Sequence, residues 1–326
     1  MTKVKNNRMK KTTLIVFTSL LSAATLSASW TTFQLNNRLS YNSTAMAHLN
    51  DGRLVYAHDG SVSQQNTFGS SAMTSFTNAP TGAYSYVTSN GYLGVGGTFV
   101  EPTAPVYKFT ATNTNSLFTS GGPIQNYVAV AYGTEILTSG INGATSEIGH
   151  YTAAGTYTSI ITDVSTYSAG LALDGAGNLY VADNDDQRIY SFTAAQVTAA
   201  ISGPALTIAD GAFVTNLGVS GSLAVDSLGR LYAAGYQLNG IQVFDTNTLI
   251  AGSLTPYAEN KNYVVSTFSD GTDDYVGWLN AEGFSAGDGV TYGYDLDGAI
   301  VVPEPSTYAL LAGLFTLAAV GVRRRQ

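Results

Sequence analysis

Aspartates are the residues of this sequence whose spacing best fits a chemical role. Asp174 and Asp226 each end a short apolar run and are followed three residues later by glycine, so the two hold equivalent positions. Asp183, Asp185 and Asp186 form a second, tighter cluster. Calcium accepts about six to eight oxygen ligands in irregular geometry. These five aspartates are therefore candidate calcium ligands.

Each of these carboxylates also has a structural interpretation. An aspartate side chain accepts hydrogen bonds from the backbone of the turn that follows it, which would account for Asp174 and Asp226 without any ligand. The acidic clusters at residues 183–186 and 270–274 lack the ligand spacing of an EF-hand loop and also fit solvated turns. We favour the structural interpretation in each case and keep calcium as the alternative.

No catalytic constellation accompanies these carboxylates. The chain contains no cysteine, which excludes disulfides, cysteine-ligated zinc and thiol catalysis. His48, His58 and His150 occur without a tight metal-binding spacing such as HExxH, and no G-x-S-x-G nucleophile motif is present. We therefore expect structural or surface roles for the histidines and assign no catalytic residue. Whether the protein is an enzyme stays open, and the sequence leans against it.

The elements that carry Asp174 and Asp226 belong to a repeat. Residues 170–192 and 221–245 share an apolar run, an aspartate, a glycine turn, a second apolar run, a polar turn and a third run that contains phenylalanine near its end. Weaker copies occur earlier in the chain. The turn glycines of the five units are Gly52, Gly91, Gly133, Gly177 and Gly229. A period of about 40–50 residues with several short strands per unit is typical of a β-propeller.

The two best copies resemble the NHL-type propeller repeat, and the stretches LALDGAGNLYVAD and RIYSF within residues 171–192 carry the resemblance. It implies an all-β propeller over residues 30–300. A sixth unit fits residues 263–298, and a strand around residues 32–39 is expected to pair into it and close the ring. The prediction is six blades, with seven left open. We expect the glycines to occupy turns with positive φ, and no amphipathic helix of useful length in this domain.

Residues 1–29 have the pattern of a secretory signal peptide. Five basic residues, Lys3, Lys5, Arg8, Lys10 and Lys11, precede an apolar run over residues 14–26 and the small residues Ser27, Ala28 and Ser29. That run is shorter than the roughly 20 residues of an ordinary membrane-spanning helix. We expect export by the Sec machinery and cleavage near residue 28 or 29.

Residues 301–326 form a second targeting segment. Val302-Pro303-Glu304-Pro305-Ser306 precedes an uncharged run over residues 307–322, and Arg323, Arg324 and Arg325 follow at once. The uncharged run is at the low end of membrane-spanning length, and the arginines hold its end in the cytoplasm. The two prolines keep the preceding strip extended and accessible, because proline disfavours helix at its own position and at the one before it.

This tripartite segment resembles the PEP-CTERM sorting signal of Gram-negative bacteria that make exopolysaccharide. The resemblance implies recognition by an exosortase, transient anchoring in the inner membrane, cleavage near Pro303-Glu304-Pro305, and delivery to the cell surface or the extracellular matrix. A permanent membrane anchor is the alternative interpretation. The signal identifies a destination and leaves the function of the exported domain open.

Between the two targeting segments the chain is acidic. From residue 31 to residue 301, six basic residues stand against 21 acidic ones, a formal charge of −15. Such a surface disfavours nucleic acid as a partner and attracts cations. Two function classes follow. The favoured one is a non-catalytic surface protein that binds exopolysaccharide or another surface protein. The alternative is a calcium-dependent lactonase-like or lyase-like propeller enzyme with Asp174 and Asp226 as metal ligands.

Overall fold

The computed structural model describes the strands and turns of the domain between the two targeting segments. The described residues are 31–32, 43–50, 53–58, 61–65, 73–75, 84–96, 105–111, 114–120, 125–142, 145–164, 170–183, 186–216, 222–234, 241–245, 251–254, 263–269, 274–280 and 291–292. The predicted signal peptide, the sorting segment, Asp185 and residues 270–273 lie outside them. No described helix is long and apolar enough to cross a membrane.

The first half of the described chain forms three sheets. The first sheet contains β2 (Ser43–His48), β3 (Leu54–His58), β4 (Ser61–Gln65) and β5 (Met73–Ser75). The second sheet contains β6 (Tyr84–Val87), β7 (Tyr92–Gly96), β8 (Val106–Ala111) and β9 (Thr114–Thr119). The third sheet contains β10 (Gln125–Tyr132), β11 (Glu135–Asn142), β12 (Thr145–Tyr151), β13 (Tyr157–Val164) and β17 (Leu206–Thr207).

The second half forms three more sheets. The fourth sheet contains β14 (Leu171–Leu173), β15 (Leu179–Asp183), β16 (Arg188–Phe192) and β18 (Ala212–Asn216). The fifth sheet contains β19 (Ser222–Val225), β20 (Arg230–Ala234), β21 (Ile241–Asp245) and β22 (Ala251–Leu254). The sixth sheet contains β23 (Tyr263–Ser269), β24 (Asp274–Asn280), β25 (Thr291–Tyr292) and β1 (Thr31–Thr32).

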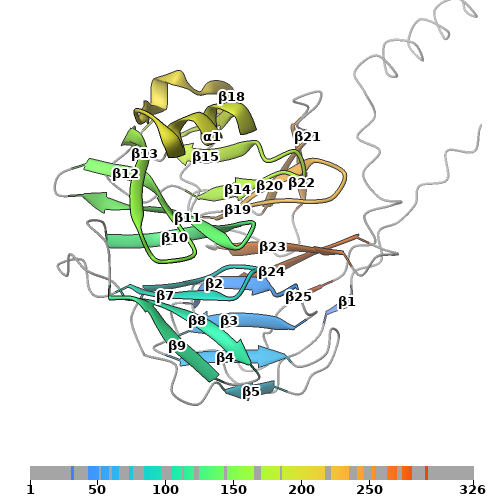
Figure 1. Cartoon of the computed structure of the whole chain (residues 1–326). Coiled ribbons are helices and arrows are strands. Elements are labelled where there is room, and N and C mark those ends of the chain that lie inside the picture. Colours follow the sequence, from blue (N-terminus) through green and yellow to red (C-terminus); the bar gives the residue numbers. More distant parts are fainter. Residues whose placement is uncertain are drawn as a thin grey trace, which may run out of the picture.

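The six sheets are arranged in a ring (Figure 1). Each sheet has one inner strand, which lies nearest the centre of the ring. The six inner strands are β2, β6, β10, β14, β19 and β23. Each inner strand contacts the next one around the ring, and β23 contacts β2 to complete the circle. Neighbouring strands within a sheet run antiparallel, except that β17 pairs with β13 in parallel. The fold is therefore all-β and propeller-like, as the repeat predicts.

The strands read as continuous apolar runs because both of their faces are buried. In β15, Leu179 and Val181 pack into the core between the third and fourth sheets. Tyr180 and Ala182 point the other way, into the core between the fourth and fifth sheets. Successive side chains of a strand point to opposite faces, so a sheet packed between two neighbours needs apolar residues at every position.

Four of the five turn glycines of the repeat adopt the predicted conformation, and the fifth, Gly52, lies outside the described residues. Gly91, Gly133, Gly177 and Gly229 have φ values of 87°, 60°, 85° and 80°. This left-handed region is accessible to glycine because it has no Cβ. In three of these turns the glycine N–H donates to the carbonyl oxygen three residues earlier, on Thr88, Asp174 or Asp226. The sequence repeat therefore corresponds to a structural repeat, in which each unit contributes one such turn between its first two strands.

The ring is closed by a strand from the beginning of the domain. Thr31 and Thr32 pair with Tyr292 and Thr291 of β25. This confirms the predicted pairing for residue 32, whereas the rest of the predicted strand, residues 33–39, lies outside the described residues. The sixth sheet therefore combines segments from both ends of the domain.

The prediction that the domain has no amphipathic helix of useful length is wrong. Helix α1 (Ala194–Ser202) lies between β16 and β18, and η1 (Ile208–Asp210) follows it. A capping box starts the helix: Gln196 N–H donates to Thr193 Oγ1, and Thr193 N–H donates to Gln196 Oε1. Val197 and Ala200 are buried in the core that includes β13. The T-x-x-Q pattern at residues 193–196 is the sequence signal that could have revealed this helix.

Glycines inside strands make room for tyrosine rings. Gly94 of β7 pairs with Tyr86 of β6, and a Cβ atom at position 94 would overlap the Tyr86 ring. Gly149 of β12 lies in the same way against the ring of Tyr157 on β13. Both rings are held in the tightly packed region between the second and third sheets, where Tyr86 is fully buried.

Replacing Gly94 by alanine should therefore lower the free energy of unfolding by about 1–3 kcal/mol, since the new methyl group forces a buried ring out of its position. Chemical denaturation measures this loss. A Gly94→Ala/Tyr86→Leu double variant should lose less than the sum of the two single variants, because removal of the ring relieves the overlap. Additive losses would show that the ring and the glycine do not interact.

Candidate functional site

The inner strands surround a central channel with a volume of about 230 Å³. Residues of all six inner strands line it, and most of them are alanine, valine and leucine. The polar lining residues are His48, Thr88, Ser89, Ser266 and Thr267. In the part of the chain that the structure describes, none of the lining residues is an aspartate, glutamate, lysine or arginine. The channel is therefore an uncharged, weakly polar site at the axis of the ring.

The geometry of the inner strands explains why the channel wall is polar despite its alanines and leucines. Each inner strand is the terminal strand of its sheet and pairs with another strand on one side only. Apolar side chains of these strands, such as Leu171, Ala172 and Val87, pack into the cores between sheets. The remaining edge of the strand carries N–H and C=O groups, and this edge faces the channel.

Two hydrogen bonds join neighbouring inner strands within the channel. His48 Nδ1 lies 3.3 Å from Ser266 Oγ, which connects β2 of the first sheet with β23 of the sixth. Thr267 Oγ1 donates to the carbonyl oxygen of Val225 at 2.8 Å and connects β23 with β19. The side chains of β23 therefore tie the last sheet to both of its neighbours.

Burial determines the charge state of the channel histidine. Desolvation lowers the pKa of His48 from 6.5 to about 3, because the buried site disfavours the charged imidazolium. The imidazole is therefore neutral at physiological pH, and a base this weak is poorly suited to take a proton from Ser266. The pair can orient an uncharged ligand by hydrogen bonding, but it is a poor nucleophile and base combination.

Asp174 caps the turn between β14 and β15. Its Oδ1 accepts from the N–H groups of Ala176 at 2.9 Å and Asn178 at 2.8 Å. Its Oδ2 accepts from Asn178 Nδ2 at 2.8 Å and from the Tyr180 hydroxyl at 3.3 Å. These are the bonds expected for the structural interpretation, and Asp174 is not among the channel-lining residues.

Asp226 caps the equivalent turn between β19 and β20 with a stronger set of donors. Its Oδ1 accepts from the N–H groups of Leu228 at 3.0 Å and Arg230 at 2.8 Å. Its Oδ2 accepts from Arg230 Nε at 2.6 Å and from the Tyr232 hydroxyl at 3.0 Å. The carboxylate is buried, and it too is absent from the channel lining. The structure thus places the two aspartates in equivalent turns, each bonded within its own sheet.

The acidic cluster is partly described. Asp183 is buried, and its Oδ1 accepts from the N–H of Asp186 at 3.2 Å. Asp186 Oδ2 accepts from the Tyr190 hydroxyl at 3.0 Å and lies 3.7 Å from Arg188. Asp185 lies outside the described residues. In the part of the chain that the structure describes, no group of three or more histidines, aspartates or glutamates lies close enough together to hold a metal ion.

Calcium binding by these aspartates can be measured directly. A ligand at about a hundred times its dissociation constant stabilises the folded state by about 2.7 kcal/mol. Because the described carboxylates are occupied by hydrogen-bond donors, we expect thermal unfolding of the full chain to be the same in millimolar calcium and in excess chelator. A rise in unfolding temperature with calcium would instead assign ligand roles to Asp174, Asp226 or the 183–186 cluster.

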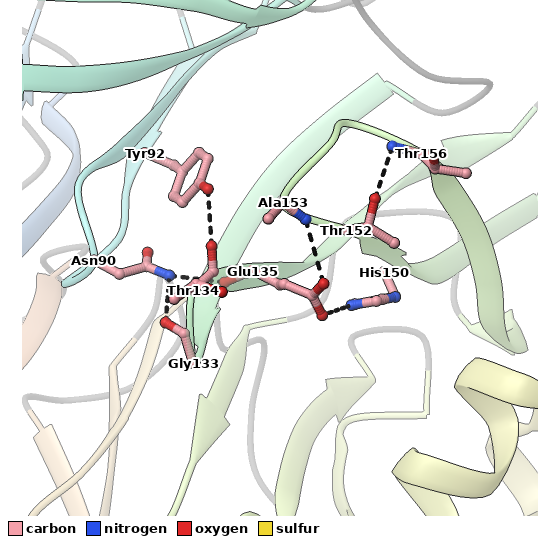
Figure 2. A network of polar contacts seen from close by, with 9 residues as sticks. All are labelled: Asn90, Tyr92, Gly133, Thr134, Glu135, His150, Thr152, Ala153 and Thr156. Atoms are coloured by element: carbon pink, nitrogen blue, oxygen red, sulfur yellow. Dashed lines mark hydrogen bonds and ion pairs between the residues drawn. The ribbon is translucent and has the colours of Figure 1, made fainter.

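A polar network joins the turns of the second and third sheets (Figure 2). Asn90 Nδ2 donates to the carbonyl oxygens of Gly133 at 3.0 Å and Glu135 at 2.7 Å. The Tyr92 hydroxyl donates to the carbonyl oxygen of Thr134 at 2.9 Å. These bonds hold the two neighbouring turns in a fixed relation. Sequence reasoning did not identify this network, because its members are about 40 residues apart.

His150 belongs to the same network and has a structural role, as the sequence indicates. Its Nε2 lies 2.7 Å from Glu135 Oε2, and the other oxygen of Glu135 accepts from the N–H of Ala153 at 3.3 Å. The ring of Tyr132 packs edge-on against the imidazole. Figure 2 shows Glu135 between His150 and the turn that follows β12. The side chain of His58 is not described.

Another buried carboxylate, that of Glu147, links two outer strands of the third sheet. Glu147 of β12 accepts hydrogen bonds from the Tyr157 hydroxyl and from Ser159 Oγ of β13. Burial and this carboxylate raise the pKa of Tyr157 far above its usual range, so the phenol stays protonated. The group is a cross-strand link and is separate from the channel.

Comparison with known proteins identifies the C-terminal segment and the fold. Residues 301–325 match the PEP-CTERM protein-sorting motif. No curated protein matches the sequence. Among solved structures, the chain resembles a calcium-binding protein, regucalcin, from Agrobacterium tumefaciens, with a TM-score of 0.59 and 12% identity over 81% of this chain and 93% of that one.

Two further structures show the same likeness. A gluconolactonase from Xanthomonas campestris has a TM-score of 0.59 and 14% identity over 85% of this chain and 92% of its own. A luciferin-regenerating enzyme has a TM-score of 0.58 and 12% identity over 82% of this chain and 96% of its own. These TM-scores indicate a shared fold, and at such low sequence identity the activities of these proteins cannot be assigned to this chain.

Proposed function

We propose that this protein is an exported β-propeller of six blades that an exosortase cleaves and delivers to the surface or extracellular matrix of a Gram-negative bacterium. There it acts as a non-catalytic binding or structural protein associated with exopolysaccharide or with other surface proteins. The observation that carries the proposal is the PEP-CTERM protein-sorting motif over residues 301–325. This motif implies export and sorting through the membrane.

The parts of the C-terminal segment suit this processing. Residues 302–306, Val-Pro-Glu-Pro-Ser, provide an extended strip that a protease can reach. The uncharged run at residues 307–322 would hold the chain in the inner membrane, and Arg323 to Arg325 would stop its transfer. The signal peptide proposed for residues 1–29 would deliver the chain to the Sec machinery. Six sheets in the described residues support the six-blade count.

The channel supports binding more than catalysis. The lining residues that the structure describes include no carboxylate, and the one histidine among them, His48, is a weak base. Asp174 and Asp226, the metal ligands of the enzymatic alternative, are each engaged by four hydrogen bonds within their own turns. A calcium-dependent lactonase or lyase would need these carboxylates to turn toward the channel. We therefore do not favour that alternative.

Mass spectrometry of the protein released from cells tests the sorting proposal. We expect a new C-terminus within residues 303–306, and we expect a Pro303→Ala/Pro305→Ala double variant to stay in the membrane with its arginines, because the extended cleavage strip is lost. A Glu282→Gln variant, which changes a glutamate outside the motif, should be processed normally. A released protein that still carries Arg325 would contradict cleavage at this motif.

A further inference from the structure

The channel wall offers many hydrogen-bonding groups in a small space. Six strand edges converge on it, one from each sheet, and each edge carries backbone donors and acceptors. His48 and Ser266 add an imidazole and a hydroxyl at the junction of the first and sixth sheets. A molecule placed at the axis would therefore meet donors and acceptors from several directions.

The charge of the wall restricts the kind of molecule that can bind. Among the described residues, the channel lining contains no acidic side chain, no lysine and no arginine. An ion taken from water into this site would lose hydration without meeting an opposite charge, which is strongly unfavourable. The domain is acidic overall, yet this charge is absent from the channel lining. An uncharged ligand is therefore favoured over anions and over cations alike.

The volume of the channel restricts the size of the ligand. At about 230 Å³, the channel is smaller than the roughly 300–1,000 Å³ of pockets that hold drug-sized ligands. It is comparable with a single sugar ring. The alanine, valine and leucine residues of β10, β14 and β19 line the side opposite β2, and those of them that are buried, such as Leu171 and Ala172, turn their side chains into the cores between sheets.

We propose that the central channel binds one uncharged monosaccharide unit, whose hydroxyls bond to the inner-strand edges and to Ser266, which His48 holds in place. A sugar hydroxyl both donates and accepts, which matches a wall that carries donors and acceptors together. This inference deepens the binding role proposed above and rests on it, because it names the site and the ligand class.

Ligand-observed NMR titration of the full chain in a non-glycosidic detergent tests the proposal. The probes are glucose, galactose and rhamnose, compared with the charged relatives glucuronate and glucosamine. We expect at least one neutral sugar to bind, and the charged relatives to bind about tenfold more weakly or worse, because the wall lacks a counter-charge. Binding of glucuronate or glucosamine as tight as that of glucose would overturn the proposal, as would no binding by any neutral sugar.

Three variants locate the binding site. Ser266→Ala removes one hydroxyl from the channel and should weaken binding about threefold to tenfold. Ser266→Leu adds bulk beside His48 and should abolish binding. Ser116→Ala changes an exposed serine on β9, outside the channel, and should leave binding unchanged. Each variant is first shown to unfold cooperatively. Unchanged binding by a folded Ser266→Leu variant would place the sugar site elsewhere and overturn the proposal.

A hexasaccharide distinguishes the two sources of such a sugar. Maltohexaose that binds more tightly than glucose indicates the end of a polysaccharide chain, and equal or weaker binding indicates a free sugar. Either result agrees with a monosaccharide site. The sorting proposal is judged separately, by the new C-terminus of the released protein. Failure of sugar binding with normal processing therefore removes only this inference.

Discussion

An Asp226→Ala variant should lose about 3–5 kcal/mol of its free energy of unfolding. The Asp226 carboxylate is buried and accepts from two turn N–H groups, from Arg230 Nε at 2.6 Å and from the Tyr232 hydroxyl. The side chain of Arg230 is itself only 13% exposed. Removing Asp226 takes the paired carboxylate away from a largely buried charge, and this loss accounts for most of the expected effect.

The equivalent turn provides the matched control for this prediction. Asp174 is half-buried and accepts from Asn178 where Asp226 accepts from an arginine. An Asp174→Ala variant therefore loses turn hydrogen bonds but leaves no buried charge, so we expect a loss of about 1–2 kcal/mol. Urea denaturation of both variants, with calcium and with chelator, measures the difference. Equal losses for the two variants would contradict the role assigned to the ion pair.

The stability of the protein should fall as the pH is lowered from 7 toward 3, and His48 should be a main cause. In the folded state burial lowers the pKa of His48 to about 3, whereas in the unfolded chain it is near 6.5. Between these values the unfolded state binds more protons, so acid favours unfolding. The contribution is fully present above pH 6.5. It should shrink by about 2 kcal/mol at pH 5 and by about 4 kcal/mol near pH 3.

A His48→Asn variant separates this effect from the titration of carboxylates. Asparagine can still bond to Ser266 but does not titrate. The free energy of unfolding of the variant should therefore change less between pH 7 and pH 5 than that of the wild type. Most carboxylates titrate below this window. His150→Asn changes a buried histidine outside the channel and tests whether the effect is specific to position 48. A wild-type slope that persists in His48→Asn would show that burial of this imidazole is not the cause.

The sequence predicts those parts of the fold that depend on residues close together in the chain. Gly177 and Gly229 could be identified as turn residues because the left-handed conformation needs glycine. Asp174 and Asp226 could be assigned to turn caps because the donors lie within four residues of each carboxylate. The propeller followed from the spacing of these turns. Each of these inferences depends on residues that are neighbours in the chain.

The parts that the sequence does not reveal depend on distant neighbours. His48 and Ser266 are separated by 218 residues, and only closure of the ring brings them together. Asn90 Nδ2 donates to backbone carbonyl oxygens of the third sheet, so the types of the side chains around Gly133 do not indicate the contact. Helix α1 is a different case, since its Thr193–Gln196 capping box is local and readable. The helix was missed because the pattern interrupts a β repeat.

The pairing of β1 with β25 gives the ring an order of assembly. Thr31 and Thr32 come first in the domain, and their partners, Thr291 and Tyr292, come last. Contacts between residues so far apart in sequence form slowly, since a long loop must close before any bond repays it. If the chain crosses the membrane with its N-terminus leading, as the proposed signal peptide implies, β1 cannot pair until residues 291–292 have emerged, and the sixth sheet is the last to be completed.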